Sequence, residues 1–402
     1  MSDTPTSYAS AIDIPVVRQP FNAENCPNYL GITIGTPSGL LHEVQVDTGS
    51  TGIVIPASLL MVDGDTTKGL VSGVVALGPA QIAYQPSGNT LVGCLYLVPS
   101  LSLGASLNES KQVVSVCEAG PLIVFGAKYA GNTSTPGVQN PVDPGMGMMG
   151  IGFGRPALSY TANAGQSDQI VYSLSNPFLA ASVGGQPLYP SYLLSSAGSG
   201  LNGYITLGVT TAEFTASPFD GQTVPLTSAK PPVTPNASAS TCDCAPASGT
   251  SWPAAPTQPY WLTGPAAVTI STAHDGLPLN GTMLLDTGVT GAMMSVPQAR
   301  NWAANLGGAE ITITVPNASN ASAAPVMTYS FAVSTAAPVN GVFAIDPSLS
   351  TAAAPVSLEP VVPSSNIAFV NTGINVLLAY NYFFDGQSGQ LGFATAAPVT
   401  LP

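Results

Sequence analysis

Two stretches of the chain, VQVDTGSTGIVIP at 44–56 and MLLDTGVTGAMMSVP at 283–297, follow the same pattern. Each begins with an apolar run typical of a buried strand, continues with Asp-Thr-Gly, one residue and Thr-Gly, and returns to an apolar strand that ends at a proline. Asp-Thr-Gly alone is a common turn sequence. Its recurrence in the same strand context in each half indicates that one β domain was duplicated in tandem.

The rest of the 402-residue chain reads as short strands, with apolar runs such as YLGITIG (29–35) and AVTIS (267–271) between clusters of Gly, Pro, Asn and Ser. We therefore predict a mostly β protein of two related lobes. An N-terminal extension covers 1–20, the N-terminal lobe 21–209 and the C-terminal lobe 210–402. Residues 228–257 are rich in Pro, Ala and Ser and lack periodicity, which predicts a surface loop inserted in the second lobe.

The duplicated turns place one carboxylate in each half, Asp47 and Asp286. If the two halves pack around a pseudo-twofold axis, these carboxylates meet at that axis. Two carboxylates in contact cannot both ionise, so they share one proton. The ionised member can then take a proton from water while the protonated member donates one to a substrate carbonyl.

Five further segments resemble, in the same order along the chain, parts of the pepsin-like aspartic proteases. NYLGITIGTPSGLLHEVQVDTGSTGIVIP (28–56) is similar to the first strands and first active-site loop of that family, and AYQPSGNTLVG (83–93) occupies the place of its flap hairpin. MMGIGFGRP (148–156) resembles the segment that threads under the first active-site loop. PYWLTGPAAVTIS (259–271) resembles the approach to the second aspartate, and TGINVLLAYNYFFDGQSGQLGFA (372–394) resembles the last hairpin.

The resemblance implies a bilobal pepsin-like fold, two β-barrel-like lobes with a cleft between them, and an aspartic endopeptidase active at acid pH on peptides or proteins. Asp47 and Asp286 are the expected catalytic residues, and Tyr84 is the expected flap tyrosine that contacts substrate. The expected active-site loop residues are Thr48, Gly49, Ser50, Thr287, Gly288 and Val289. The alternative is a non-catalytic binding or inhibitor protein on the same fold, because fold does not determine function.

The resemblance is a divergent one. Val289 stands where a hydroxyl often supports the second carboxylate, a role that Ser50 fills in the first copy. The loss of that donor predicts that the acidic limb of the rate profile lies at higher pH than with hydroxyls on both sides. The tryptophan usual in the first loop is Val54, and the last hairpin follows Asn-Thr-Gly (371–373) instead of two apolar residues and Gly.

Charged residues make up only 7% of the chain, and seven Lys and Arg against twenty Asp and Glu give 7 − 20 = −13. So few basic groups argue against nucleic-acid binding and against binding to anionic membranes. No apolar run is long enough to span a bilayer. A chain with few bases acquires little positive charge in acid, which is typical of acid tolerance.

Only two histidines, His42 and His274, are present, so we expect neither a metal nor another cofactor. A Cys-x-Cys metal site at 242 and 244 would lack a matching cluster of His or Cys nearby. We expect His42 to lie at the surface or at a sheet edge. Five cysteines, at 26, 94, 117, 242 and 244, leave at least one without a partner in the chain.

The first residues, MSDTPTSYASAIDIP (1–15), lack the basic region and apolar core of a signal peptide. Few Lys and abundant Ser, Thr, Asn and Pro favour export. We therefore expect an extracellular or periplasmic monomer whose leader is absent from this sequence, with a cytoplasmic location as the alternative.

Overall fold

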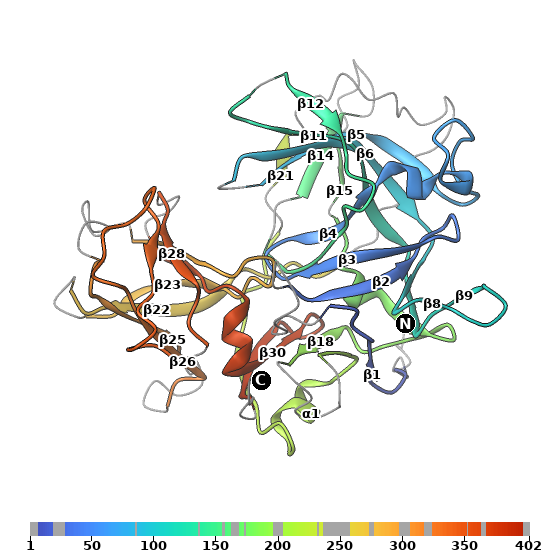
Figure 1. The fold of residues 1–402 in the computed structure, drawn as a ribbon. Helices are drawn as coiled ribbons and strands as arrows, with labels where there is room; N and C mark the ends of the chain where they lie inside the picture. Colours follow the sequence, from blue (N-terminus) through green and yellow to red (C-terminus); the bar gives the residue numbers. More distant parts are fainter. Residues whose placement is uncertain are drawn as a thin grey trace. The chain divides into compact units, whose positions relative to one another are not determined.

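The computed structural model describes residues 7–18, 29–84, 87–135, 137–154, 157–161, 169–172, 174–195, 204–230, 233–235, 258–272, 277–296, 306–316, 324–351, 353–362 and 367–396. Strands dominate these residues (Figure 1). Their helices are short: α1 (Thr211–Thr215) and the 3-10 helices η1 (Ala57–Leu60), η2 (Val62–Gly64), η3 (Pro177–Ala180) and η6 (Ile374–Leu378). The chain divides into two compact units, in agreement with the predicted mostly β protein of two lobes.

The first unit comprises residues 1–10, 31–190 and 230–260 and is built on a curled twelve-stranded sheet. In spatial order the sheet contains β17 (Gln186–Pro187), β16 (Ala181–Val183), β10 (Cys117–Ala119), β7 (Leu101–Leu103), β2 (Gly31–Gly35), β3 (Leu41–Asp47), β13 (Met148–Ile151), β4 (Thr51–Pro56), β11 (Leu122–Asn132), β6 (Asn89–Val98) and β5 (Val75–Ala83), with β12 (Gln139–Pro141) paired to β11. Smaller pairings join β8 (Ser106–Leu107) to β9 (Val113–Val114), and β14 (Ala157–Thr161) to β15 (Gln169–Tyr172) and β21 (Val233–Pro235).

The second unit comprises residues 11–30, 191–229 and 261–402 and contains two sheets. The eight-stranded sheet runs through β26 (Met327–Ala332), β25 (Glu310–Val315), β22 (Gly264–Ile270), β23 (Leu279–Leu284), β29 (Ala368–Asn371), β24 (Ala292–Ser295), β28 (Ser357–Pro360) and β27 (Phe343–Ala344). The six-stranded sheet runs through β1 (Ile12–Asp13), β19 (Ile205–Leu207), β18 (Ser191–Leu194), β30 (Tyr380–Asp385), β31 (Gln390–Thr395) and β20 (Gln222–Pro225).

The boundaries of the units differ from the predicted ones, because some strands pair with strands that are distant in sequence. Residues 191–209, predicted to end the first lobe, belong to the second unit because β18 pairs with β30 of the last hairpin. Part of the predicted N-terminal extension, 11–20, joins the same unit because β1 pairs with β19. The segment 230–260 groups with the first unit, where β21 pairs with β14. Most of the loop predicted at 228–257 lies outside the described residues.

Both units contain the same three-strand arrangement around the Asp-Thr-Gly turn. In the first unit β13 lies between β3, to which it runs parallel, and β4, to which it runs antiparallel. In the second unit β29 lies in the same way between β23 and β24. Hence a later strand of each unit passes beneath its turn, as predicted for the segment that begins at Met148. The strands before and after each turn are both paired to this later strand.

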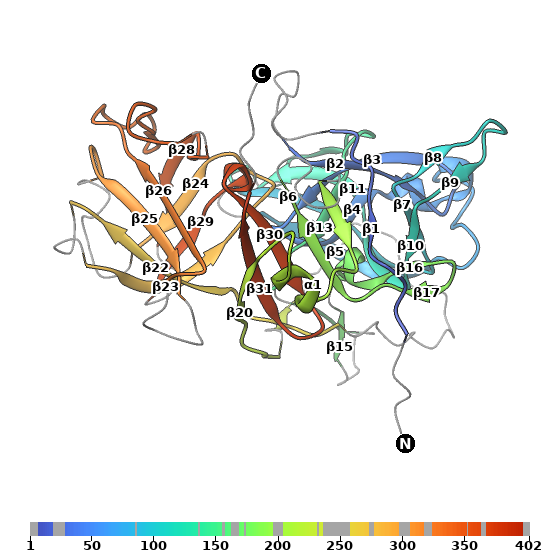
Figure 2. The same cartoon turned by 90° about the horizontal axis from the view of Figure 1, so that it is seen from below.

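Period-two alternation explains how these strands are buried. Along β3, LHEVQVD, His42, Val44 and Val46 are buried while the residues between them are partly exposed. β22, GPAAVTI, alternates in the same way in the second unit. In that unit Phe214 of α1 stacks on Phe383 of β30 with ring centroids 4.4 Å apart. Figure 2 shows α1 beside the last hairpin, β30 and β31. The aspartate turns therefore stand on well-packed supports.

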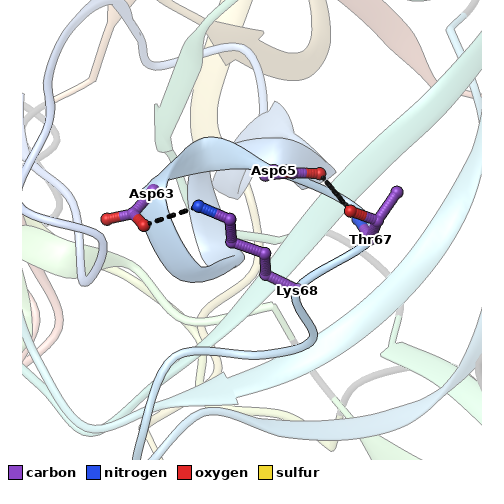
Figure 3. A network of polar contacts seen from close by, with 4 residues as sticks. All are labelled: Asp63, Asp65, Thr67 and Lys68. Atoms are coloured by element: carbon purple, nitrogen blue, oxygen red, sulfur yellow. Dashed lines mark hydrogen bonds and ion pairs between the residues drawn. The ribbon is translucent and has the colours of Figure 1, made fainter.

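Several of the few charged residues lie in surface turns. In the loop after β4, Lys68 Nζ lies 2.9 Å from Asp63 Oδ2, and both side chains are exposed (Figure 3). Hydrogen bonds from the Thr67 hydroxyl and amide lower the pKa of Asp65. Water and salt screen exposed contacts of this kind, so they contribute little to the free energy of unfolding.

The described cysteines differ in state. Cys94 is disulfide-bonded, whereas Cys117 is a free, buried thiol. Burial, and then the nearby Glu118 carboxylate, raise the pKa of Cys117 to about 12. A thiol that stays protonated is a poor nucleophile, so Cys117 acts as a packing residue.

Candidate active site

The first predicted catalytic residue, Asp47, ends β3 and is 6% exposed. The Gly49 amide donates a hydrogen bond of 2.6 Å to Asp47 Oδ1. The Ser50 hydroxyl donates one of 2.5 Å to Asp47 Oδ2. Thr48, which lies between Asp47 and Gly49 in sequence, is fully buried. The turn thus supplies a donor to each carboxylate oxygen.

The second predicted catalytic residue, Asp286, follows β23 and is 8% exposed. The Gly288 amide donates to Asp286 Oδ1 at 2.8 Å, which reproduces the contact of Gly49 in the first unit. The donor to Asp286 Oδ2 is the side-chain amide of Asn371, at 2.6 Å. Both oxygens of this carboxylate therefore have a donor as well, although Val289 has no hydroxyl to offer.

Asn371 was not identified as a site residue from the sequence. The expectation that the second carboxylate lacks one donor is wrong, because Asn371 at the end of β29 provides it. The signal in the sequence was the polar Asn-Thr-Gly at 371–373 in a place where two apolar residues are usual. An amide buried there needs a polar partner, and the nearby carboxylate is that partner.

The strand beneath the first turn leaves no room for larger residues. A Cβ at Gly150 would lie 2.5 Å from the Thr51 amide nitrogen, and one at Gly152 would lie 2.2 Å from the Thr48 carbonyl oxygen. The Gly152 amide donates to the Ser50 carbonyl at 2.7 Å. Close contact between the turn and this strand fixes the backbone that carries Asp47.

Tyr84, the predicted flap tyrosine, lies between β5 and β6, which form the expected hairpin. The Tyr84 amide donates to the Asn89 carbonyl at 2.8 Å, and its ring packs on an apolar cluster that includes Val54 and Leu91. Burial, and then the Asp47 carboxylate, raise the pKa of Tyr84. Its hydroxyl oxygen is buried and has no hydrogen-bond partner among the described residues. Val54 of this cluster is apolar and gives the hydroxyl nothing to bind.

We expect Tyr84→Phe to leave the free energy of unfolding unchanged or to raise it by up to about 1 kcal/mol, because it removes an unpaired buried hydroxyl. Thermal denaturation measures the effect. The matched control is Tyr329→Phe: the Tyr329 hydroxyl donates to the Ala353 carbonyl at 2.6 Å, so this variant should lose about 1 kcal/mol. Equal losses in the two variants would mean that the Tyr84 hydroxyl has a partner in solution.

His42 does not lie at the surface as predicted. It is a buried residue of β3, and its Nε2 lies 2.9 Å from the Met146 carbonyl oxygen. This hydrogen bond attaches the segment before β13 to β3, so His42 supports the strand beneath the first turn instead of facing Asp47. The sequence-based expectation was wrong because an imidazole next to a carbonyl can be buried at little cost.

Neither a metal site nor a membrane-spanning helix is found in the described part of the chain. No group of three or more His, Cys, Asp or Glu side chains gathers there in a way that could hold a metal ion. No helix there combines the length and the apolar character needed to cross a bilayer. In each unit the candidate site consists of one carboxylate that accepts hydrogen bonds from a glycine amide and from one side chain.

Comparison with known proteins returns one kind of match. No protein-family model and no curated protein matches the chain. Among solved structures the chain is similar to the crystal structure of the aspartic proteinase from Irpex lacteus, with 14% sequence identity and a TM-score of 0.47. The match covers 97% of this chain and 99% of that chain. At this distance the likeness concerns the fold alone.

Proposed function

We propose that this protein is an aspartic endopeptidase of the pepsin-like family that hydrolyses peptide bonds at acid pH through Asp47 and Asp286. The observation that carries the proposal is that the same carboxylate turn is built twice. In each unit a buried aspartate receives a glycine amide on Oδ1 and a side-chain donor on Oδ2, on a strand held from both sides. A turn needed only to connect two strands does not require a buried carboxylate with both oxygens satisfied.

The proposed mechanism uses the two carboxylates as a pair. The mechanism requires Asp47 and Asp286 to meet and to share one proton. The ionised carboxylate takes a proton from a water molecule, which attacks the carbonyl carbon of the peptide bond. The protonated carboxyl group donates to the carbonyl oxygen as negative charge develops on it. The carboxyl group that took the proton from water then gives it to the nitrogen of the peptide bond, and the C–N bond breaks. The step uses no covalent intermediate, metal or cofactor.

The composition supports an acid environment. In strong acid the carboxylates are neutral, and seven Lys and Arg with two His give a positive charge of only 7 + 2 = 9 on 402 residues. Low self-repulsion leaves the folded state stable where the proposed dyad is singly protonated. In the same proposal the protein is an exported monomer, its substrates are peptides or proteins, and Tyr84 contacts the bound substrate.

Digestion of casein or haemoglobin by the purified protein tests the proposal. We expect cleavage between strong acid and mild acid, loss of cleavage at neutral pH, and inhibition by pepstatin. Fragment analysis should show internal cuts, as expected of an endopeptidase. A folded protein that cleaves neither substrate at any pH would instead support the non-catalytic alternative, and cleavage greatest at alkaline pH would exclude a shared-proton mechanism.

A further inference from the structure

We infer that Asn371 is a positioning residue of the active site: it holds the second carboxylate in place of the hydroxyl that Val289 lacks. The inference rests on the proposed function, because it assigns the supporting residue of one of the two proposed catalytic groups. Asn371 stands 85 residues from Asp286 in sequence, yet its amide nitrogen lies 2.6 Å from Asp286 Oδ2.

A second hydrogen bond fixes which way the Asn371 amide points. Its Oδ1 accepts the Gly373 backbone N–H at 3.1 Å. A flipped amide would place its NH₂ group against that N–H and its oxygen against the carboxylate, so both contacts would be lost. Because Asn371 is only 4% exposed, water cannot replace them. The amide is therefore locked with its donor toward Asp286.

Strand register shows that Asn371 has a counterpart in the first unit, and that this counterpart is Met148. In the first unit the residue seven positions after the aspartate, Val54, pairs with Met148. In the second unit the residue seven positions after the aspartate, Met293, pairs with Asn371. The parallel strand pairs agree. The residue two positions before the aspartate pairs with Met148 in the first unit and with Asn371 in the second.

Two positions can thus supply the donor: the residue after Asp-Thr-Gly, and the residue of the strand beneath the turn. The first unit uses one of them and the second unit uses the other. In the first unit the turn residue Ser50 supplies a hydroxyl, and Met148 of the strand beneath is apolar, with its sulfur 3.7 Å from that hydroxyl. In the second unit the turn residue Val289 is apolar and Asn371 of the strand beneath supplies an amide. Each carboxylate keeps one side-chain donor on Oδ2.

The exchange has a chemical consequence. A hydroxyl can either donate or accept, whereas the Asn371 nitrogen can only donate. The Asn371 N–H donates to Asp286 Oδ2 and offers no acceptor for a proton on that oxygen. Among the described residues of its own unit, none forms an ion pair with Asp286, and the other carboxylate of the proposed site is Asp47. In the proposed mechanism Asn371 therefore keeps the shared proton away from Asp286 Oδ2.

The test is the pH dependence of kcat/KM for a peptide substrate, from strong acid to neutrality. In Asn371→Leu the ionised form of Asp286 loses a donor, so ionisation of the site becomes harder. We expect the acidic limb to move to higher pH by about 1 to 2 units. Adding Val289→Thr to this variant should reverse most of the shift, while the same change in the wild-type protein should have a smaller effect, because Oδ2 already has its donor.

The matched control is Asn375→Leu. Asn375 is another buried asparagine of the same segment, but its amide donates to the Ala354 carbonyl at 2.8 Å and not to Asp286. This variant should lose stability without moving the limb. If Asn371→Leu does not fold, Asn371→Asp keeps the shape and the acceptor for Gly373 but puts a second carboxyl beside Asp286, which also moves the limb upward.

The outcomes separate this inference from the proposed function. A wild-type protein without activity contradicts the proposed function itself. An active wild type whose limb coincides with that of Asn371→Leu or Asn371→Asp overturns the role of Asn371. An equal shift in Asn375→Leu also overturns it, because the effect would then come from general loosening of the segment. A shift confined to residue 371 and reversed by Val289→Thr supports it.

Discussion

Asp47→Asn and Asp286→Asn are each expected to lower kcat/KM for a peptide substrate by about 10²–10⁴-fold, the contribution of a positioned general acid or base. Asn keeps the shape of Asp but can neither share a proton nor take one from water. Peptide cleavage at the pH of greatest wild-type activity measures the loss. Asp63→Asn, which changes an exposed aspartate of the first unit, is the control and should retain full activity.

The two variants should differ in stability. In Asp47→Asn the new amide can donate to the Ser50 hydroxyl, which rotates to accept it. In Asp286→Asn the new amide faces the Asn371 nitrogen, which cannot accept, so the free energy of unfolding should fall by about 1–3 kcal/mol. Thermal or denaturant unfolding of both variants measures the difference. Activity near the wild-type value in either variant would refute the dyad.

Gly152→Ala is expected to have the second largest effect. The added Cβ would lie 2.2 Å from the Thr48 carbonyl oxygen and 2.8 Å from the Ser50 carbonyl oxygen, both in the backbone of the first turn. Neither the turn nor the strand beneath it can move without breaking their pairing. We expect a loss of about 3 kcal/mol in the free energy of unfolding. Displacement of Asp47 should lower kcat/KM by about 10²-fold.

A glycine of the same segment provides the control. A Cβ at Gly145 would meet its nearest neighbour, Asp143 Oδ1, at 3.4 Å, which is an ordinary contact. Gly145→Ala should therefore leave both stability and activity close to those of the wild type. If Gly152→Ala behaved like Gly145→Ala in unfolding and cleavage assays, the contact between the strand and the first turn would be looser than described.

Local sequence signals predicted much of the fold. Alternation along 41–47, the Asp-Thr-Gly turns, the hairpin around Tyr84 and the last hairpin all depend on neighbouring residues, and all are present. The division into units was predicted less well, because it depends on β18 and β19 pairing with strands distant in sequence. Alternation cannot show which distant strand a given edge will meet.

The site shows the same division between local and distant information. Contacts within the turns, from Gly49, Ser50 and Gly288 to their aspartates, follow from spacing alone. The contact of Asn371 does not, since it joins residues 85 positions apart through the register of two strands. His42 was misjudged for the same reason, because its partner, the Met146 carbonyl, lies 104 positions away. How the two carboxylates meet stays a prediction.

The exchange between turn and strand also bears on how the two halves can evolve. Replacing the second turn by a copy of the first would give Asp286 both a hydroxyl and the Asn371 amide. Replacing the first turn by a copy of the second would leave Asp47 with neither, because the Met148 side chain has no donor. Ser50 and Met148 are 98 positions apart, so recombination that transfers one without the other changes the number of donors. Each turn therefore works with its own strand, and copying a turn alone from one half to the other would not preserve one side-chain donor for each carboxylate.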